Sequence, residues 1–405
     1  MANVPKPLIF DKTGKEIIQK LTEQNAILGA IAKKQMNIND DWSSIQDIVN
    51  SGNAENIFSI GGLFTDTYTN VDASNKPTYE NKWHVNDFRD FETESGETLH
   101  GMILQQNYAT LQGVPFSWYR AFLACPNGLS AGTYSVTFGA TWSKAIKGSI
   151  YSFTLTKAVP NGGRLAGFRT LADVSDQSKY AIYSYGADGK TLTEQVTATK
   201  VSAVQGTDLG TMNYDTRNGN LNSMQEAGYG CNRWKTSAIR QWLNSDKPKG
   251  SWWVAQDEFD TMPDQANTVS GYLAGFTDEF KSKLKTVKVS TVGNTPTLKN
   301  AVDVTYDKVF LPSLEEMFVS KQVNGEGTFH KYWKMRAGTT SPVPAWKDND
   351  RYISYALENH NSAQYVRLRS ASVGGPSDTW SVYSTGGVDS YSAYRACRAL
   401  PLVVI

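Results

Sequence analysis

Alternation of apolar and polar residues in the middle of the chain restricts this protein to a fold rich in β-sheet. Aromatic or aliphatic residues occupy every second position of segments 134–138 and 151–155, and Ser and Thr stand between them. A period of two buries one face of a strand and leaves the other in solvent. The pattern therefore predicts half-buried strands at both segments.

Turn dipeptides divide this region into short strands. Asn127-Gly128, Asn161-Gly162 and Asp188-Gly189 favour tight turns, because Asn, Asp and Gly tolerate positive φ. Strands joined by such turns are typical of antiparallel β-domains. We expect residues 41–205 to form a β-sandwich domain, preceded by a short helix at residues 43–50.

A helix is predicted within residues 1–40. Thr13 and Glu16 have the spacing of a capping box, in which each side chain satisfies an orphan amide of the first turn. The apolar seam that follows is Ile17, Leu21, Leu28 and Ile31, with Gln24 as its polar member. Two heptads are too few for a stable isolated coiled coil. We expect residues 1–40 to be a helical segment for oligomerisation or attachment; the alternative is a single helix packed on its own domain.

Residues 206–405 are predicted to form a separate domain that mixes helices and strands. Short helices are expected at residues 237–243, at 277–284 and after a capping box at 313–316. The predicted strands are residues 287–289, 308–310 and 402–405. The last of these is apolar without alternation, which indicates a buried strand with neighbours on both sides. The predicted fold is thus an α+β and all-β multidomain chain.

Charge and hydropathy exclude several classes of partner. A formal net charge of +1 leaves no basic footprint for nucleic acid. The sequence holds no run of eighteen apolar residues, so membrane insertion is not expected. The first residues lack the basic and apolar regions of a signal peptide, so we expect any release from the cell to use another route, such as lysis. Aromatic residues make up 12% of the 405 residues and charged residues 20%, a balance that favours a secreted or virion protein over a cytosolic enzyme.

Motifs for catalysis or metal binding are weak, and we predict neither an enzyme nor a cofactor. The four histidines are scattered, and the three widely spaced cysteines are expected to be buried thiols. Two alternatives remain open. Asp257, Glu258 and Asp260 lie near two tryptophans and would suit a glycosidase, but a solvated surface is favoured. The acidic residues at 348–350 and Glu358 would suit calcium, but a solvated turn is favoured.

The last fifty or so residues have the composition of a binding surface. Tyr, Ser, Asn, Asp and Gly crowd there between recurrent Arg and Trp. Tyr and Trp offer large contact areas with few torsions to order, and Ser, Gly and Asn offer adaptable hydrogen bonds. Aromatic residues and Arg also dominate the energetics of protein contacts. The composition therefore predicts ligand recognition by this part of the chain.

Three sequence runs resemble phage and bacterial modules with a C-type-lectin-like fold. They are residues 229–244 (Tyr-Gly-Cys-Asn-Arg-Trp-Lys-Thr-Ser-Ala-Ile-Arg-Gln-Trp-Leu-Asn), 310–316 (Phe-Leu-Pro-Ser-Leu-Glu-Glu) and 394–405 (Tyr-Arg-Ala-Cys-Arg-Ala-Leu-Pro-Leu-Val-Val-Ile). Residues 44–52 followed by 58–62 resemble the domain that precedes this module in phage structural proteins, including targets of diversity-generating retroelements.

The resemblance implies a receptor-binding or adhesive protein of a phage particle. Such proteins are commonly trimeric, contact other virion proteins through the N-terminus and present the lectin-like face to a bacterial surface glycan or protein. The alternative is a purely structural head decoration or fibre protein without its own ligand. The fold also occurs in oxidases that make formylglycine, whose chemistry needs a reactive cysteine pair. Packing explains Cys231 and Cys397 better, and we do not expect that activity.

In the retroelement targets, variation is concentrated near the C-terminus, and the matching stretch here is about residues 350–394. The predicted outward ligand-binding positions are Tyr352, Tyr355, Asn359, Asn361, Tyr365, Arg367, Arg369, Asp378, Trp380, Tyr383, Asp389, Tyr391 and Tyr394.

Strand alternation ranks these candidates. In residues 365–369 it places Val366 and Leu368 inward and the Tyr and two Arg outward. Trp380 is left open between core and surface, since tryptophan is usually largely buried. Arg395 and Arg398 are expected to pair with carboxylates in a structural role, because an unpaired buried guanidinium is costly.

Overall fold

A computed structural model describes residues 41–118, 121–139, 146–170, 178–212 and 224–405, together with Glu16, Gln19, Lys20 and Thr22. These last four positions are helical. The rest of the predicted attachment segment, residues 1–40, including its apolar seam, lies outside the described residues. The helix expected there and its role in oligomerisation therefore stay a prediction.

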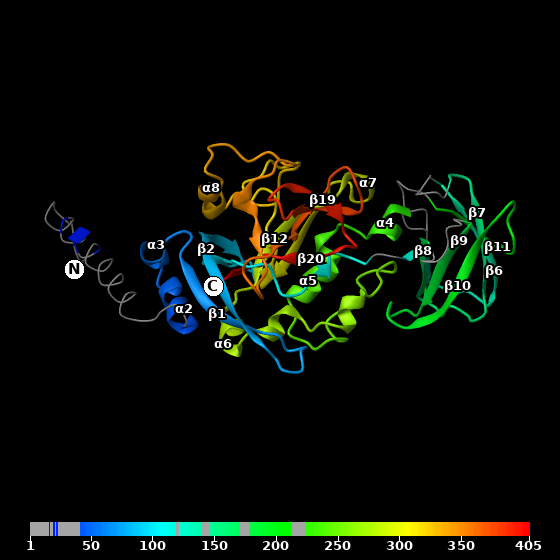
Figure 1. The fold of residues 1–405 in the computed structure, drawn as a ribbon, viewed down its shortest axis with the longest axis horizontal. Coiled ribbons are helices and arrows are strands. Elements are labelled where there is room, and N and C mark those ends of the chain that lie inside the picture. Colours follow the sequence, from blue (N-terminus) through cyan, green and yellow to red (C-terminus); the bar gives the residue numbers. More distant parts are fainter. Residues whose placement is uncertain are drawn as a thin grey trace, which may run out of the picture.

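A five-stranded antiparallel sheet joins the two ends of the described chain (Figure 1). Its strands, in spatial order, are β1 (Leu63–Thr69), β2 (Thr78–Glu92), β3 (Thr98–Gln106), β21 (Leu402–Val404) and β14 (Val309–Phe310). The C-terminal strand β21 pairs with β3 on one side and with β14 on the other. Residues 402–405 are all fully buried. The prediction of a buried terminal strand with two neighbours is thus confirmed.

A second five-stranded sheet carries most of the tyrosine-rich tail. Its order is β19 (Val388–Ser392), β18 (Asp378–Val382), β17 (Val366–Ala371), β20 (Ala396–Ala399) and β4 (Val114–Pro115). The pair β17 and β20 is parallel and the other pairs are antiparallel. Two hairpins complete this part of the molecule: β12 (Val287–Val292) with β13 (Val302–Asp307), and β15 (Ser354–Tyr355) with β16 (Ala363–Gln364).

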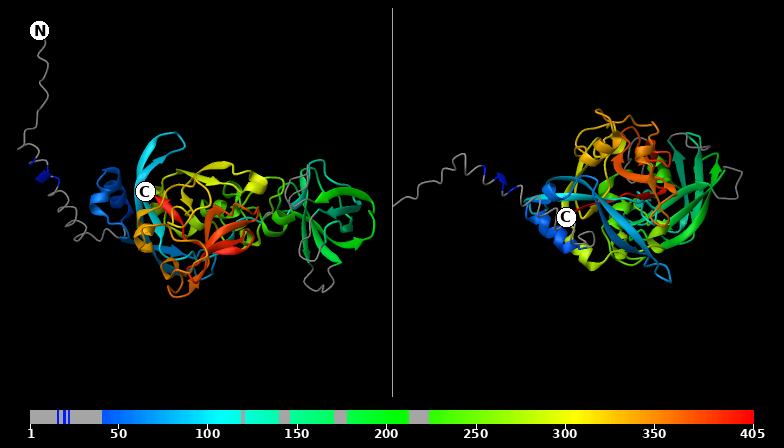
Figure 2. Two further views of the ribbon diagram at one scale, coloured as in Figure 1. Left: turned by 90° about the horizontal axis from the view of Figure 1, so that it is seen from above. Right: turned by 60° about the vertical axis from the view of Figure 1, so that its left-hand side comes forward.

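A single seven-stranded sheet forms one end of the molecule (Figure 2). Its order is β11 (Thr207–Met212), β6 (Gly132–Phe138), β7 (Ile150–Leu155), β10 (Leu192–Val201), β9 (Lys179–Tyr185), β8 (Gly163–Thr170) and β5 (Ala121–Cys125). The rings of Phe138 and Tyr180 lie 6.2 Å apart although two strands separate β6 from β9. Neighbouring strands are about 4.8 Å apart, so the sheet must curl strongly around its own core.

The predicted domain boundaries need correction. A β-sandwich was expected over residues 41–205, but β1, β2 and β3 pair with β21, and β4 pairs with β20. The remaining strands of that region form the one curled sheet rather than two stacked sheets. Residues 121–212 are therefore an insertion in a unit built from residues 41–118 and 224–405. Strand pairings between residues some three hundred positions apart leave no local signal in the sequence.

Short helices cover the sheets of this split unit (Figure 1). They are α2 (Trp42–Asn50), α3 (Ala54–Ile57), α4 (Met224–Tyr229), α5 (Ala238–Leu243), α6 (Asp278–Lys283), α7 (Thr295–Leu298) and α8 (Lys331–Ala337), with 3-10 turns at Trp234–Thr236, Asp264–Asn267, Tyr272–Gly275 and Asp350–Tyr352. Ser237 and Thr277 cap α5 and α6 through their side chains, as their positions predict. No helix in the described part of the chain is long and apolar enough to cross a membrane.

The capping box at residues 313–316 forms without a helix. The Ser313 amide donates to Glu316 Oε2 at 3.0 Å, and the Glu316 amide donates to Ser313 Oγ at 3.2 Å. The chain then turns away at Phe318, whose φ is +58°. A left-handed residue cannot continue a right-handed helix, so the predicted third helix stops at isolated turns.

An aromatic core fixes α2 and α6 onto the first sheet. The ring of Phe280 lies 4.8 Å from that of Trp42 and 5.2 Å from that of Trp83. Phe276 contacts both Phe280 and Trp83, at 5.0 and 5.9 Å. Such ring pairs add to the hydrophobic gain of burial. The N-terminal helix of the described unit is thus anchored by residues more than two hundred positions away.

The cysteines are buried thiols outside any disulfide of the described residues, as predicted. Cys125 lies in the inserted sheet, and Cys231 and Cys397 lie in the split unit. Burial raises the pKa of the Cys125 thiol to about 12, which keeps it protonated near neutral pH.

Two histidines are buried where the first sheet meets α8. His84 on β2 stacks on the ring of Tyr332 at 3.8 Å. His330, just before α8, lies with Nδ1 2.7 Å from Asn86 Nδ2. Burial lowers the pKa of His84 to about 3 and that of His330 to about 4. Both rings are therefore neutral in the folded protein near pH 7.

The central role of β21 predicts a large cost for shortening its side chains. Leu402→Ala removes a fully buried side chain between two strands, and we expect it to lower the free energy of unfolding by about 2–5 kcal/mol. Leu192→Ala, at a residue that is 50% exposed on β10, is the matched control. Urea unfolding monitored by circular dichroism checks both, and equal losses in the two variants would contradict the role assigned to β21.

The buried histidines predict acid sensitivity. As the pH falls from 6.5 toward 4, the unfolded chain takes up protons at His84 and His330 that the folded chain excludes, so the free energy of unfolding falls. Above pH 6.5 this contribution to stability is fully present. His84→Phe keeps a ring over Tyr332 and cannot ionise, so its melting temperature should depend less steeply on pH in this window.

The wild-type protein is the reference for the acid experiment, and the melting temperatures of both proteins are measured from pH 7 to pH 4. An unchanged slope in His84→Phe would contradict a neutral buried His84.

Candidate ligand-binding face

Three predicted tyrosines meet at one edge of the second sheet. Val366 of β17 pairs with Val382 of β18, so Tyr365 and Tyr383 stand side by side just beyond that pair. Strand β19 returns antiparallel to β18 and sets Tyr391 opposite Thr379, four residues from Tyr383 along the sheet. The Tyr391 ring nevertheless lies close to the rings of Tyr365 and Tyr383, so side chains 26 positions apart in the sequence meet there.

The three rings form a contiguous cluster. Tyr365 lies 4.8 Å from Tyr383 and 6.0 Å from Tyr391, and Tyr383 and Tyr391 are 6.0 Å apart. Tyr365 is 42% exposed, and the other two are half-buried. Burial and the neighbouring Asp389 carboxylate raise the pKa of Tyr383 to about 12. The Tyr383 phenol thus stays protonated and donates to the carbonyl of Ser390 at 3.1 Å.

The Arg367 side chain lies inside the protein beneath the tyrosine cluster. The prediction that this side chain points outward is wrong. The side chain is fully buried. Its guanidinium donates to Thr379 Oγ1 at 2.6 Å and to the carbonyls of Tyr391, Ser392 and Arg395 at 2.6, 3.0 and 3.0 Å. It also lies 5.5 Å from the centre of the Tyr391 ring. Arg367 therefore ties β17 to the turn after β19 instead of contacting a ligand.

Arg369 is a second correction, because it is only 2% exposed. It forms an ion pair with Glu316 and donates to the carbonyls of Leu311 and Glu326, both at 2.6 Å. Strand β17 is buried on both faces. Alternate residues along it therefore point into the protein interior on opposite sides of the sheet, and neither set faces solvent. A buried guanidinium is tolerated when its donors are satisfied in this way.

Tyr352 and Trp380 are also buried, each about 1% exposed, and do not belong to a contact surface. The Tyr352 hydroxyl donates to the carbonyl of Met317 at 2.8 Å, and its ring stacks on Trp333 at 5.1 Å. The Trp380 indole donates to Gln322 Oε1 at 3.2 Å. Both rings fill the core beneath the second sheet, as large aromatic side chains commonly do.

Tyr355, Asn359 and Asn361 are exposed on the neighbouring β15–β16 hairpin. Tyr355 is 40% exposed. Asn359 Oδ1 accepts from the amides of Asn361 and Ser362 at 3.1 and 3.0 Å, which closes an Asx turn. Asn359 thus shapes the loop, and its amide group donates to Ser362 Oγ at 2.9 Å.

The remaining predicted positions lie around the sheet in half-buried settings. Asp378 begins β18, and burial raises the pKa of its carboxyl. Asp389 accepts hydrogen bonds from the indole of Trp346 and from the amide of Ser390. Tyr394 packs against Tyr229 with ring centres 5.9 Å apart. Of these three, Asp389 is connected to the tyrosine cluster through its effect on Tyr383.

A groove of about 430 Å³ runs beside the cluster. Its lining residues are Leu111, Gln112, Gly113, Gln364, Tyr365, Tyr391, Ala396, Cys397 and Arg398. Two of the predicted tyrosines thus form one wall, and the chain next to β4 forms the other. Ligand sites are concave surfaces of this order of size, lined by rings and a few polar groups.

The two C-terminal arginines behave differently. Arg398 pairs with both oxygens of Glu358 at 2.6 Å, which confirms its predicted structural pairing. Arg395 is exposed and lies over the ring of Tyr394, at 4.8 Å from its centre. Arg395 forms no ion pair with a carboxylate of the described residues, so the structural pairing expected for it stays a prediction.

Trp346 is a surface residue that the sequence analysis missed. It is 64% exposed, with φ of +61°, and its indole donates to Asp389. Its ring centre lies 5.2 Å from that of the buried Trp380. A tryptophan between Pro344 and Lys347 does suggest a loop position, but only the fold places it beside β19.

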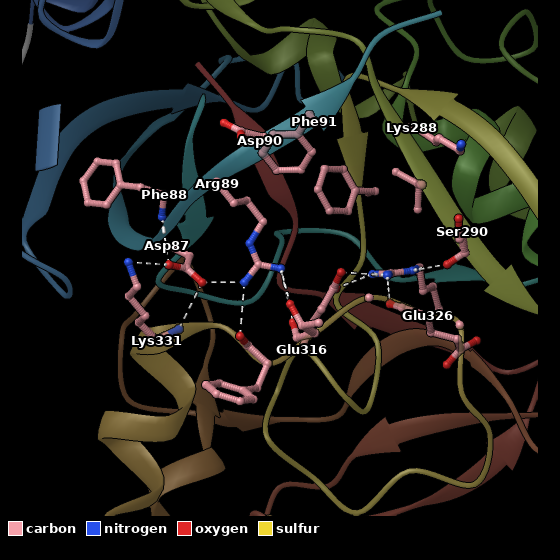
Figure 3. Close-up of a pocket in the computed structure, with 17 residues that line it drawn as sticks. Asp87, Phe88, Arg89, Asp90, Phe91, Lys288, Ser290, Glu316, Glu326 and Lys331 are labelled. Atoms are coloured by element: carbon pink, nitrogen blue, oxygen red, sulfur yellow. Dashed lines mark hydrogen bonds and ion pairs between the residues drawn. The ribbon is translucent and has the colours of Figure 1, made fainter. Parts of the chain in front are cut away.

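A polar pocket of about 670 Å³ lies between β2, β12 and the loop at residues 325–329 (Figure 3). Arg89 forms an ion pair with Asp87 and donates to the carbonyls of Thr328 and Phe329 at 3.3 and 3.1 Å. Lys331 Nζ lies 3.5 Å from Asp87. These groups connect the first sheet to the segment that leads into α8.

The deep wall of this pocket is the Arg369–Glu316 pair. Burial opposes ionisation of Glu316, but the Arg369 guanidinium outweighs it and lowers the pKa of the carboxyl. Burial raises the pKa of Glu326, which accepts from the hydroxyl of Ser370 and the amide of Val292. The buried charges of the pocket are thus engaged with one another, and this geometry favours a structural role.

The carboxylates considered for catalysis or calcium have other partners. Asp260 is 2% exposed, and burial together with the Asp257 charge raises its pKa well above the usual range. Trp252 and Trp253 are in the core, where a substrate could not reach them. Asp348 accepts from Thr385 at 2.8 Å, and Glu358 is paired with Arg398. Nowhere in the described ranges do three or more His, Cys, Asp or Glu side chains gather in a group that would hold a metal ion.

The fold and this face define a β-rich protein of several sheets with a tyrosine-lined surface. The chain belongs to the family described as Domain of unknown function (DUF6273), whose model matches residues 199–402. The match begins within β10 and ends in β21, so it includes the whole second sheet except β4. Searches for similar curated proteins and for similar solved structures gave no match.

The support of the cluster by Arg367 predicts a strong effect of its removal. Arg367→Leu leaves several buried carbonyls without a donor, and we expect it to lower the free energy of unfolding by about 3 kcal/mol or more. Arg395→Leu, at an exposed arginine in the turn between β19 and β20, should change it by less than about 0.5 kcal/mol. Thermal unfolding checks both, and similar small effects would contradict the supporting role of Arg367.

Proposed function

We propose that this protein is a non-enzymatic adhesin of a phage particle, which binds a glycan or protein on a bacterial surface through Tyr365, Tyr383 and Tyr391. The observation that carries the proposal is the clustering of these three rings beside a groove of about 430 Å³. The virion setting and the C-type-lectin-like assignment come from the sequence resemblance.

The chemistry of the cluster supports recognition. Tyrosine rings offer apolar faces and a hydroxyl together, so they bind both proteins and sugar rings with little loss of side-chain entropy. The ring contacts among the three tyrosines restrict their torsions before any ligand arrives. A preorganised surface of this kind loses less conformational freedom on binding.

The scaffold beneath the rings supports the same function. Arg367 holds the backbone at Tyr391 and at the turn after β19 from inside the sheet. Ligand-contacting residues placed on strand ends keep their positions better than residues on free loops. The rings of Tyr365, Tyr383 and Tyr391 are thus held on a backbone that is fixed from inside the protein.

Mutual contacts of the three resembling runs favour the lectin-like assignment. Phe310, the first residue of the second run, pairs with Leu402 in the last run. Asn244, at the end of the first run, donates to the carbonyl of Val309, the residue before the second run, at 2.7 Å and accepts from its amide at 3.0 Å. The amide of Tyr394 also donates to the carbonyl of Tyr229 at 2.8 Å. The runs thus pack as one structural unit, as expected of motifs from one module.

Attachment to the particle is proposed for the N-terminal segment. Its predicted helix precedes α2, which lies at the opposite end of the molecule from the inserted sheet (Figure 2). A trimer held by this segment would present three copies of the tyrosine face, and such multivalency raises the overall avidity.

Binding to bacteria tests the proposal. The full chain, fluorescently labelled, is incubated with a panel of bacterial isolates and with an array of bacterial surface glycans. Against the isolate or glycan that binds, Tyr365→Ala and Tyr391→Ala should each weaken binding by at least about tenfold, as truncation of a central aromatic contact does. Tyr306→Ala, at a half-buried tyrosine on β13, is the matched control.

Two results would contradict the proposal. Equal binding by the wild type and both cluster variants would exclude the tyrosine face. Absence of binding to every isolate and glycan would favour the alternative of a structural head or fibre protein without its own ligand.

A further inference from the structure

Hydrogen bonds to backbone carbonyls connect the inserted sheet to the rest of the molecule. Arg164 on β8 donates to the carbonyls of Asp257 and Asp260 across the junction and to that of Ala187 at 2.8 Å within its own sheet. The amide of Met262 donates to the carbonyl of Gly189 at 3.3 Å. The Arg164 side chain is almost fully buried. The two parts therefore have a fixed relation at this point.

A cleft of about 220 Å³ opens beside this junction. One wall comes from the inserted sheet and holds Tyr183 and Tyr185 of β9. The facing wall is the segment from Thr261 to Asp264, and Trp118 lines the cleft from the chain before β5. The cleft shares no lining residue with the groove at the tyrosine cluster.

Strand geometry directs the rings of this cleft to one side. Tyr183 and Tyr185 are two positions apart, so both side chains leave the same face of β9. Beside them on β8, Gly167 has a φ of +121°, and a Cβ there would lie 2.6 Å from the carbonyl oxygen of Ala181 and 3.2 Å from the Tyr183 ring. Only glycine keeps this backbone and the position of the Tyr183 ring.

We propose that this cleft is a second binding site and that it takes a sugar ring. Trp118, Tyr183 and Tyr185 are each partly exposed, so they offer aromatic faces to the C–H side of a sugar. Asp264 is exposed at the rim, and its carboxylate accepts hydrogen bonds from hydroxyl groups. Aromatic faces combined with a carboxylate acceptor match the mixed apolar and hydroxyl surface of a saccharide.

The carboxylate distinguishes a sugar from the other common ligand of aromatic grooves. Proline-rich peptides also dock between aromatic rings. The proline residues that contact the rings, however, have no backbone N–H to donate to Asp264. A sugar offers several hydroxyl donors next to its apolar face, so a single ring can contact both the aromatic side chains and the carboxylate.

A sugar site in this cleft would add a second contact to the bacterial attachment proposed above. The site lies on a different part of the chain from the tyrosine face, so one molecule would contact a glycan at two places. Two weak contacts on one chain raise the effective affinity without any tighter single site. The sugar site itself does not depend on the tyrosine face being a binding surface.

Saturation-transfer difference NMR on the full chain tests the second site. The probes are the methyl glycosides of glucose, galactose, mannose, N-acetylglucosamine and N-acetylgalactosamine, for which we expect dissociation constants on the order of millimolar for at least one sugar. Tyr183→Ala should abolish the transfer or weaken binding by about tenfold, whereas Tyr183→Phe, which keeps the ring, should retain it.

Asp264→Asn provides a variant that keeps the fold, because this side chain is exposed. It should weaken binding of the same sugar by about threefold to tenfold, through loss of a charged acceptor. Tyr306→Ala, at a half-buried tyrosine on β13 that lines neither the cleft nor the groove, should leave this binding unchanged. Loss of sugar binding in Tyr365→Ala, with retention in Tyr183→Ala, would move the sugar to the tyrosine face and overturn the cleft site alone.

Other outcomes also overturn the proposal. They are no transfer to any of the five glycosides, equal binding by Tyr183→Ala in a folded state, equal binding by Asp264→Asn, and binding of a proline-rich decapeptide in place of the sugars. Folding of each variant is verified by its melting temperature. Failure of the cleft site leaves the cell-binding experiment with Tyr365 and Tyr391 unaffected.

Discussion

Pairing of the C-terminal strand between β3 and β14 is the constraint on which the rest of the structure depends. It joins residues 402–404 to residues 103–105 and so closes one unit from the two ends of the described chain. The aromatic core of Trp42, Trp83 and Phe280 packs against this sheet, and the second sheet follows directly from β20 into β21. Such nonlocal pairing has a high entropic cost of loop closure, and the buried apolar side chains of the strand must offset it.

Local features of this fold could be predicted from the sequence because their causes are local. Ser237 and Thr277 cap helices where their side chains reach the backbone, and residues 134–138 and 151–155 form the strands that their alternation indicates. The domain division failed because the partner of β3 lies near residue 403. The outward positions predicted for Arg367 and Arg369 on β17 were also wrong, because both side chains are charged yet buried. Alternation marks two different faces, but it does not say that one of them is solvent.

At the candidate face, composition predicted a contact surface, but only the fold shows which aromatic side chains belong to it. A tyrosine-rich tail predicts a contact surface, and Tyr365, Tyr383 and Tyr391 do gather there. Tyr352 and Trp380 have the same composition signal but fill the core. Their positions depend on which strands lie above and below them. Arg367 then links the two sets, because a buried guanidinium fixes the backbone that presents the exposed rings.

The central functional proposal is that the three clustered tyrosines contact a bacterial surface ligand. Hydroxyl-radical footprinting of the full chain, with and without bacterial envelope material that it binds, measures this contact most directly because it reports the accessibility of each aromatic side chain. The account predicts protection of Tyr365 and Tyr391 on binding, with no change at Tyr306. Unchanged oxidation of Tyr365 and Tyr391 in the bound state, with protection elsewhere on the chain, would contradict it.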